Sequence, residues 1–184
     1  FGELKQPDLN LTSWTGLAAP AGTPEAIVNQ LYAAMRTVLQ DPATVATLEA
    51  NARAVDDAND LQLPIMLEPF MSEWVDGKIV NDLSPDAVIL SIAIASGLGN
   101  SSAYSWLKLP VVPEMERVMA STTLPTLLLG GDPNGDAEET FASWAAALAL
   151  PGVRGLVVGR SLLYPADGDV ASAIDTAAAL VHGS

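Results

Sequence analysis

The residues of this chain that are best suited to chemistry lie at the ends of apolar segments. Lys108 lies in the run YSWLKLPVV (104–112), although the chain has only three lysines. A buried ammonium group is costly, so such a lysine either extends its amine to solvent or uses it in a reaction. A neutral amine can attack a carbonyl carbon, and apolar neighbours such as Trp106 and Leu107 favour the neutral form. Lys108 is therefore a candidate nucleophile.

A carboxylate occupies the corresponding place in an earlier apolar segment. Glu68 lies between Leu67 and Pro69 in the run LPIMLEPF (63–70). Carboxylates are seldom buried without a partner. One interpretation is a purely structural salt bridge to Lys108, and the other is a proton-transfer group beside the amine. The sequence leaves both interpretations open.

Two glycine-containing segments follow the last two apolar runs. LLLGGDP contains Gly130 and Gly131, and VVGRS contains Gly159 and Arg160. Backbone amides at a helix start, together with an arginine, suit a phosphate group or another anion. Tight turns between a strand and a helix also require glycine, which is the alternative explanation.

The composition argues against several classes of function. The formal net charge is −14, and the eight basic residues are scattered, which disfavours binding to nucleic acid or to anionic membranes. The chain has no cysteine and a single histidine, which argues against thiolate catalysis, a Ser-His-Asp triad and a multi-histidine metal site. Four aspartates lack calcium-loop spacing, so we expect turns and helix caps at Asp132, Asp136, Asp167 and Asp169. We therefore expect no metal and no cofactor.

The longest apolar run, at 87–98, is too short to span a bilayer and is interrupted by serine. No signal peptide is recognisable in a sequence that begins at Phe1. We expect the chain to be cytoplasmic.

The elements that position the candidate residues alternate between strands and helices. Strands are predicted at 63–70, 104–112, 124–132 and 153–161, and each is followed by a helical segment. Two further helices are predicted at 24–39 and 43–58, and Ser84 and Pro85 are expected to start the helix after the first strand. Continuous apolar strands in this order indicate a parallel α/β sheet covered by helices. The candidate residues would then gather at the carboxyl ends of the strands, where such folds bind ligands.

Four of these segments carry a family resemblance. LPIMLEPF, WLKLP, LPTLLLGGD and VRGLVVGRSLLYP resemble, in this order, the last four strands of class I, Schiff-base-forming (β/α)8 aldolases. The group with the strongest resemblance is the aldolase-like domain linked to myo-inositol catabolism, which is related to class I tagatose-bisphosphate aldolases. The resemblance covers residues 41–184 and implies half of a TIM barrel, built from four β/α units and preceded by an N-terminal extended and helical segment at 1–40.

The resemblance also implies roles for particular residues. Lys108 would form the Schiff base, and Glu68 would act in proton transfer. The substrate phosphate would be bound by Gly130, Gly131, Gly159 and Arg160.

The segment before residue 41 is similar to a different family. WTGLAAPAGTPEAIV followed by LQDP, within residues 9–40, resembles part of the periplasmic solute receptors of tripartite tricarboxylate transporters. This second resemblance implies a chimera of two proteins.

The leading hypothesis is a lyase of the class I aldolase type, acting without a metal on a small sugar phosphate or keto compound. The alternatives are a non-catalytic, self-associating half-barrel and a remnant of a periplasmic solute-binding protein. Four parallel strands cannot close a barrel. We therefore expect a homodimer or a higher homo-oligomer, which would cover inner-face residues such as Ile65, Leu67, Leu128 and Val157; the N-terminal helices are the alternative cover.

Overall fold

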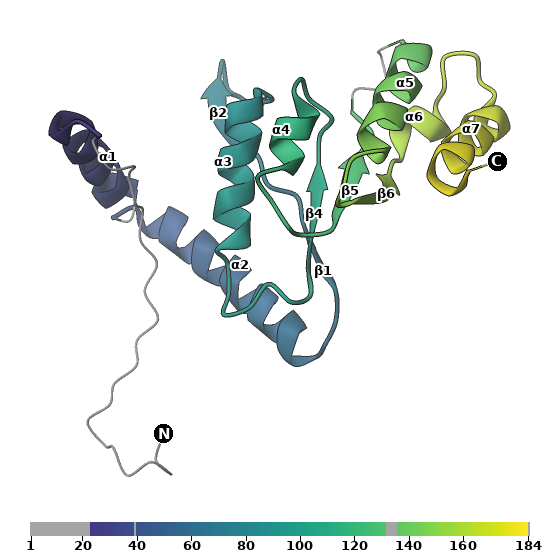
Figure 1. The fold of residues 1–184 in the computed structure, drawn as a ribbon. Helices are drawn as coiled ribbons and strands as arrows, with labels where there is room; N and C mark the ends of the chain where they lie inside the picture. The colour runs from purple at the N-terminus through teal and green to yellow at the C-terminus, as the bar shows by residue number, and fades with distance from the viewer. Residues whose placement is uncertain (1–22, 39, 132–135, 184) are drawn as a thin grey trace. The chain divides into compact units, whose positions relative to one another are not determined.

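The computed structural model describes residues 23–38, 40–131 and 136–183 (Figure 1). Its strands are β1 (Ile65–Leu67), β2 (Met71–Val75), β3 (Lys78–Asp82), β4 (Ser105–Leu109), β5 (Thr126–Leu129) and β6 (Val153–Val157). Its helices are α1 (Glu25–Val38), α2 (Pro42–Asp60), α3 (Pro85–Ser96), α4 (Met115–Met119), α5 (Ala137–Leu148), α6 (Arg160–Leu163) and α7 (Val170–His182). None of these helices is long and apolar enough to cross a membrane.

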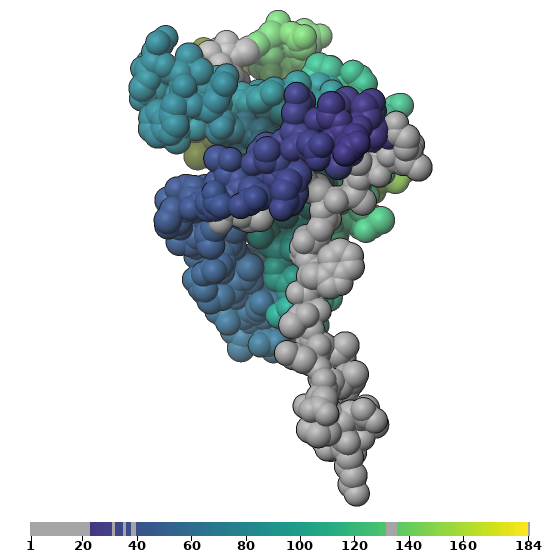
Figure 2. Space-filling model, turned by 90° about the vertical axis from the view of Figure 1, so that its left-hand side faces the viewer, coloured from purple at the N-terminus to yellow at the C-terminus, as the bar shows by residue number. Residues whose placement is uncertain are grey.

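The chain divides into two compact units, Phe1–Thr47 and Leu48–Ser184. The first unit contains α1, which begins after Pro24, whose carbonyl oxygen accepts hydrogen bonds from the backbone N–H groups of Ile27 and Val28. The α1 side chains whose exposure is described are all exposed. Figure 2 shows the residues of this helix in purple. The strands and every candidate site residue belong to the second unit.

The second unit is built on a parallel sheet. Among the described residues, the strands pair in the order β1-β4-β5-β6, so each strand pairs with the next parallel strand along the chain. Helices follow each strand, as predicted: α3 follows β1, α4 follows β4, α5 follows β5, and α6 and α7 follow β6. The predicted fold class, a parallel α/β sheet with the arrangement of half a (β/α)8 barrel, is confirmed.

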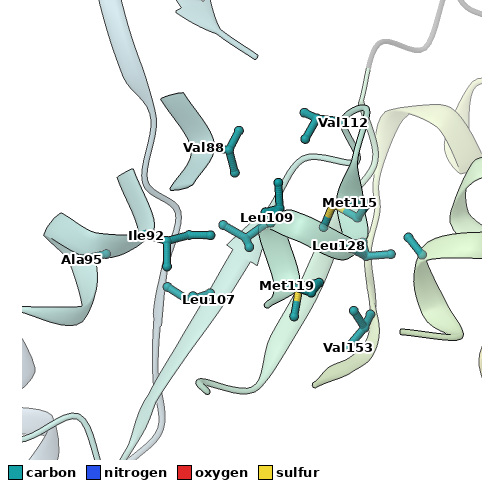
Figure 3. Packing of buried hydrophobic residues seen from close by; sticks show 12 residues of the cluster. Val88, Ile92, Ala95, Leu107, Leu109, Val112, Met115, Met119, Leu128 and Val153 are labelled. Atoms are coloured by element: carbon teal, nitrogen blue, oxygen red, sulfur yellow. The ribbon is translucent and has the colours of Figure 1, made fainter. Parts of the chain in front are cut away.

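The hydrophobic core lies between one face of this sheet and its helices, as Figure 3 shows. In β4, Leu107 and Leu109 are fully buried in this core. Side chains alternate between the two faces of a strand, so Trp106 and Lys108 project from the opposite face. Burial of each large apolar side chain contributes about 1.5–3 kcal/mol, which fixes the orientation of β4 and thereby that of Lys108. The core also contains Val88 and Ile92 of α3, Val118 and Met119 of α4, and Leu128 of β5.

The prediction of an exposed inner face was wrong for Leu128 and Leu67. Leu128 is fully buried in the core, and Leu67 is partly buried against it. Ile65 pairs with the buried Ser105, so it belongs to the same face as the core residues. The prediction was correct for Val157, which is 36% exposed. Apolar residues lie on both faces of β1 and β5, so the sequence pattern does not distinguish one face from the other.

An antiparallel hairpin between β1 and α3 was not predicted. Strands β2 and β3 pair from Met71↔Asp82 to Val75↔Lys78. The two residues between them, Asp76 and Gly77, have φ values of 48° and 75°, as a type I′ turn requires. An Asp-Gly pair between short strand-forming segments is the sequence signal for such a hairpin.

The hairpin leads directly into α3. The Ser84 backbone N–H donates to Asp82 Oδ1 at 2.8 Å, and this hydrogen bond is the main cause that lowers the pKa of Asp82. Ser84 Oγ in turn accepts a hydrogen bond from the Ala87 backbone N–H at 3.3 Å, and Pro85 is the first helical residue. This confirms the predicted start of the helix and fixes the hairpin at its base.

Candidate active site

The structure brings Glu68 and Lys108 together. The parallel register pairs Leu67 of β1 with Leu107 of β4, so the two following residues lie side by side at the carboxyl ends of the strands. Lys108 Nζ lies 2.9 Å from Glu68 Oε2 and donates a hydrogen bond to it. The Lys108 side chain is 19% exposed and that of Glu68 is 43% exposed. Most of the Lys108 side chain is therefore buried, while its carboxylate partner reaches solvent.

The exposure of this ion pair bears on its role. Ion pairs open to solvent contribute only about 0–1 kcal/mol to stability. A purely structural salt bridge would thus add little to the fold. A carboxylate at hydrogen-bonding distance from an amine can, however, accept and return protons during addition to a carbonyl.

The glycine segments meet at the ends of β5 and β6. Ser161 Oγ donates a hydrogen bond to the carbonyl oxygen of Gly130 at 3.2 Å, which links the two segments. A Cβ atom at Gly130 would lie 2.7 Å from Val158 Cγ1, and Gly131 has a φ of 70°. Both positions therefore require glycine for structural reasons, which agrees with the alternative explanation that tight turns between a strand and a helix need this residue. Gly159 precedes α6, and Arg160 is its first residue.

A cleft of about 670 Å³ connects most of these residues. Of the predicted site residues, Glu68, Gly130, Gly131 and Arg160 line it. Lys108 is next to the cleft through its hydrogen bond to Glu68. Arg160 is exposed and forms no ion pair with any residue of the described ranges. The cleft thus has a carboxylate–amine pair and a cation that has no counter-ion among the described residues.

Several residues that line the cleft were not predicted. Helix α5 contributes Thr140, Ser143 and Trp144, and the hairpin contributes Asn81. Trp144 is only 2% exposed, and its ring packs edge-on against Phe141 with 5.3 Å between centroids. The spacing of Thr140 and Ser143, three residues apart, places both hydroxyls on one face of a helix and could have indicated them.

Three of the four aspartates that were predicted in turns and caps lie in such places: Asp136, Asp167 and Asp169. Asp136 caps α5 by accepting from the Glu138 backbone N–H at 2.8 Å. Asp169 caps α7 in the same way, and Asp167 accepts from the Asp169 backbone N–H. Asp132 lies outside the described residues. Within the described part of the chain, no group of histidine, aspartate and glutamate side chains is arranged to hold a metal ion.

Comparison with solved structures shows an aldolase-like fold of the partial TIM-barrel type. An archaeal fructose 1,6-bisphosphate aldolase shares 22% identity at a TM-score of 0.61, covering 78% of this chain and 54% of that chain. A second archaeal fructose-1,6-bisphosphate aldolase structure, with its catalytic lysine covalently bound to the carbinolamine intermediate of the substrate, shares 23% identity at a TM-score of 0.62, covering 77% of this chain and 54% of that chain. At these identities the similarity defines the fold alone.

A protein-family model described as Cgl0159-like matches residues 14–178 of this chain. The chain therefore belongs to the Cgl0159-like family. The crystal structure of Cgl0159 from Corynebacterium glutamicum shares 71% identity at a TM-score of 0.74, covering 78% of this chain and 48% of that chain. The chain therefore spans about half the length of this relative. Comparison with curated proteins found no match.

The family match includes most of the segment at 9–40. The resemblance of this segment to transporter receptors, and with it the chimera, therefore gains no support. The same applies to the alternative of a remnant of a periplasmic solute-binding protein.

Proposed function

We propose that this chain has class I aldolase-like lyase activity on a small sugar phosphate or keto compound. The observation that carries the proposal is the 2.9 Å contact between Lys108 Nζ and Glu68 Oε2 beside a cleft that contains Arg160. The proposal is also supported by the fold of this chain, which is similar to that of an aldolase whose catalytic lysine forms a carbinolamine with the substrate. Sugar phosphates are intracellular metabolites, so the proposal places the chain in the cytoplasm.

The reaction would start with attack of the neutral Lys108 amine on the substrate carbonyl carbon. The alkoxide formed by the attack would take a proton from solvent, while Glu68 takes the proton released from nitrogen. Glu68 would then give its proton to the carbinolamine hydroxyl group, which leaves as water and yields the protonated imine. The protonated imine then accepts the electron pair of the carbon–carbon bond that breaks. At the same time Glu68 takes the proton of the hydroxyl group on the departing carbon, which leaves as the first product, an aldehyde. Protonation of the resulting enamine and hydrolysis of the imine release the second product and restore the amine. These steps need neither a metal nor a cofactor.

The phosphate of such a substrate would lie between the ends of β5 and β6. The Arg160 guanidinium can donate two parallel hydrogen bonds to phosphate oxygens. The backbone N–H groups of Gly130, Gly131 and Gly159 would add further donors at the same place. This assignment is supported by the lack of a counter-ion for Arg160 within the described ranges.

Replacement of Arg160 by alanine is expected to weaken the binding of phosphate-bearing ligands about 10- to 100-fold. This corresponds to the loss of a hydrogen bond to a charged group. Binding is measured by calorimetry with a sugar phosphate and with the same sugar lacking phosphate. The stability of the fold should hardly change, because Arg160 is exposed. Arg154→Ala is the control, since Arg154 is also exposed but is absent from the cleft. Equal weakening of both sugars would show that Arg160 does not bind phosphate.

A non-catalytic, self-associating half-barrel is the second candidate. Within the described residues, β1 and β6 pair on one side only, and Met66 and Val157 on the face opposite the core are 46% and 36% exposed. Open edges and exposed apolar residues favour association. We propose that two copies pair edge to edge, β6 of each with β1 of its partner, to complete an eight-stranded barrel around a two-fold axis.

Light scattering at micromolar concentration is expected to give twice the 19.1 kDa chain mass. The matched variant Met66→Lys places a charge at the exposed edge strand and should shift the equilibrium toward the monomer. A monomer that binds no hydrophobic dye would contradict this assembly, because its exposed face would then already be covered within one chain.

A further inference from the structure

Asn81 is the polar residue that the hairpin adds to the cleft. It lies in β3 and lines the same cleft as Glu68 and Arg160. Asn81 pairs with Ser72, and this is the second pair from the base of the hairpin. The hairpin starts at Met71, three residues after Glu68. Asn81 therefore belongs to the Glu68 side of the cleft, whereas Arg160 enters from α6. The hairpin residue and the carboxylate can thus contact the same part of a bound substrate.

The Asn81 side chain is held by a neighbour across the hairpin. Ser72 and Asn81 are register partners, and Ser72 Oγ donates a hydrogen bond to Asn81 Oδ1 at 2.8 Å. This bond occupies one end of the amide. The amide nitrogen carries two N–H donors, and neither has a hydrogen-bond partner among the described residues. The amide is therefore oriented, with its donor end available to a ligand.

The side chains next to Asn81 in the cleft lining are apolar. Phe70 precedes β2, Leu83 follows β3, and both line the cleft with Asn81. Asn81 thus offers a hydrogen-bond donor in a cleft that these apolar side chains also line. Such an arrangement distinguishes a substrate with an oxygen at that place from an analogue that lacks it.

We infer that Asn81 is a positioning residue that donates a hydrogen bond to the hydroxyl group next to the reacting carbonyl, with Ser72 holding its amide. This inference rests on the proposed function, because it places the carbonyl at Lys108. It predicts that Asn81 makes a ketone with this hydroxyl group bind more tightly than the deoxy analogue. The hydrogen bond from Asn81 to the substrate hydroxyl group would also limit rotation of the substrate. This keeps the carbonyl carbon in position for attack by the amine.

The test compares dihydroxyacetone phosphate with hydroxyacetone phosphate, which lacks the free hydroxyl. Calorimetry on the full chain gives the dissociation constant of each. Asn81→Ala is expected to weaken the binding of dihydroxyacetone phosphate about five- to tenfold, which is the effect of one neutral hydrogen bond. The dissociation constant of hydroxyacetone phosphate should change by no more than about twofold. Asn81→Asp keeps the shape but removes the donor, so it should lose at least as much. Ser72→Ala should give a smaller loss, again for the hydroxylated compound alone.

The same measurements on the Lys108→Met variant separate this inference from the proposed function. That variant cannot form an imine, so a difference between the two ketones that persists there, and that disappears with Asn81→Ala, reports the hydroxyl contact itself. An equal effect of Asn81→Ala on both ketones would overturn the inference, and so would no effect on either. Failure of the unaltered chain to bind either ketone would also overturn it. A chain that shows the ketone preference but gives no borohydride-trapped adduct would refute the proposed catalysis while leaving the role of Asn81 in place.

Discussion

Replacement of Lys108 by methionine is expected to abolish the covalent adduct that borohydride traps from a carbonyl substrate. Methionine fills a similar volume but has no amine, so no imine can form. The chain is incubated with a panel of sugar phosphates and keto compounds and reduced, and its mass is then measured. The unaltered chain should gain the mass of the substrate less one oxygen atom at Lys108, since water is lost and two hydrogens are added, and the variant should gain nothing.

The matched control for this experiment is Lys78→Met. Lys78 is exposed at the start of β3 and has no ion pair in the part of the chain that the structure describes. This variant should retain the adduct at full yield. An adduct that survives in Lys108→Met, or that is missing from the unaltered chain with every compound of the panel, would refute a Schiff base at this position.

The stability of Lys108→Met distinguishes the catalytic from the structural interpretation of the ion pair. Glu68 is 43% exposed, so loss of its partner leaves no fully buried charge. The free energy of unfolding should therefore change by no more than about 1 kcal/mol. Marked unfolding of the variant would instead favour a structural pair between Lys108 and Glu68.

Replacement of Gly99 by alanine is expected to destabilise the second unit by about 2–5 kcal/mol, the sum of backbone strain and overpacking. Gly99 has a φ of 74°, and a Cβ atom there would lie 2.8 Å from both Val55 Cγ1 and Asp56 Oδ1. Val55 is 1% exposed, and Asp56 accepts hydrogen bonds from the Asn100 backbone N–H at 2.6 Å and from its side-chain amide at 3.1 Å. The new methyl group would thus displace α2 from the loop before β4.

Gly77→Ala separates the two causes. Gly77 has nearly the same φ, 75°, but nothing lies within 4 Å of the position of its Cβ. This variant should lose only the part that comes from backbone strain, about 1–2 kcal/mol. Both are measured by denaturant unfolding followed by circular dichroism. A loss at Gly99 no larger than that at Gly77 would show that α2 yields to the added methyl group without cost.

The parallel part of the fold could be predicted because its signals are local. Continuous apolar strands alternate with helices, and Ser84 and Pro85 mark a helix start that the structure confirms. The hairpin was missed although Asp76 and Gly77 are the residues that its turn requires. The orientation of the strands could not be predicted, because the residues on both faces of β5 are apolar and only packing on α3 and α4 selects Leu128 for the core.

The candidate site could be predicted where it depends on strand ends. Glu68 and Lys108 follow paired residues of adjacent strands, so their contact results from sheet register alone. The placement of Asn81 in the cleft depends on the fold of the hairpin, and that of Thr140 depends on the docking of α5. Such placements arise from tertiary packing, which no short sequence pattern encodes.

The strand order β1-β4-β5-β6 has a consequence for how the chain folds during synthesis. Each parallel strand pairs with the one made before it, so each new β/α unit can add to an edge that already exists. Each pair nevertheless joins residues well separated in sequence, such as Ile65↔Ser105 and Leu107↔Thr126, and parallel pairing of this kind is slow to form. The connection from β1 to β4 carries the hairpin and α3, and its closure forms the first parallel pair. The contact between Glu68 and Lys108 needs only this pair of strands, both of which are made before Arg160.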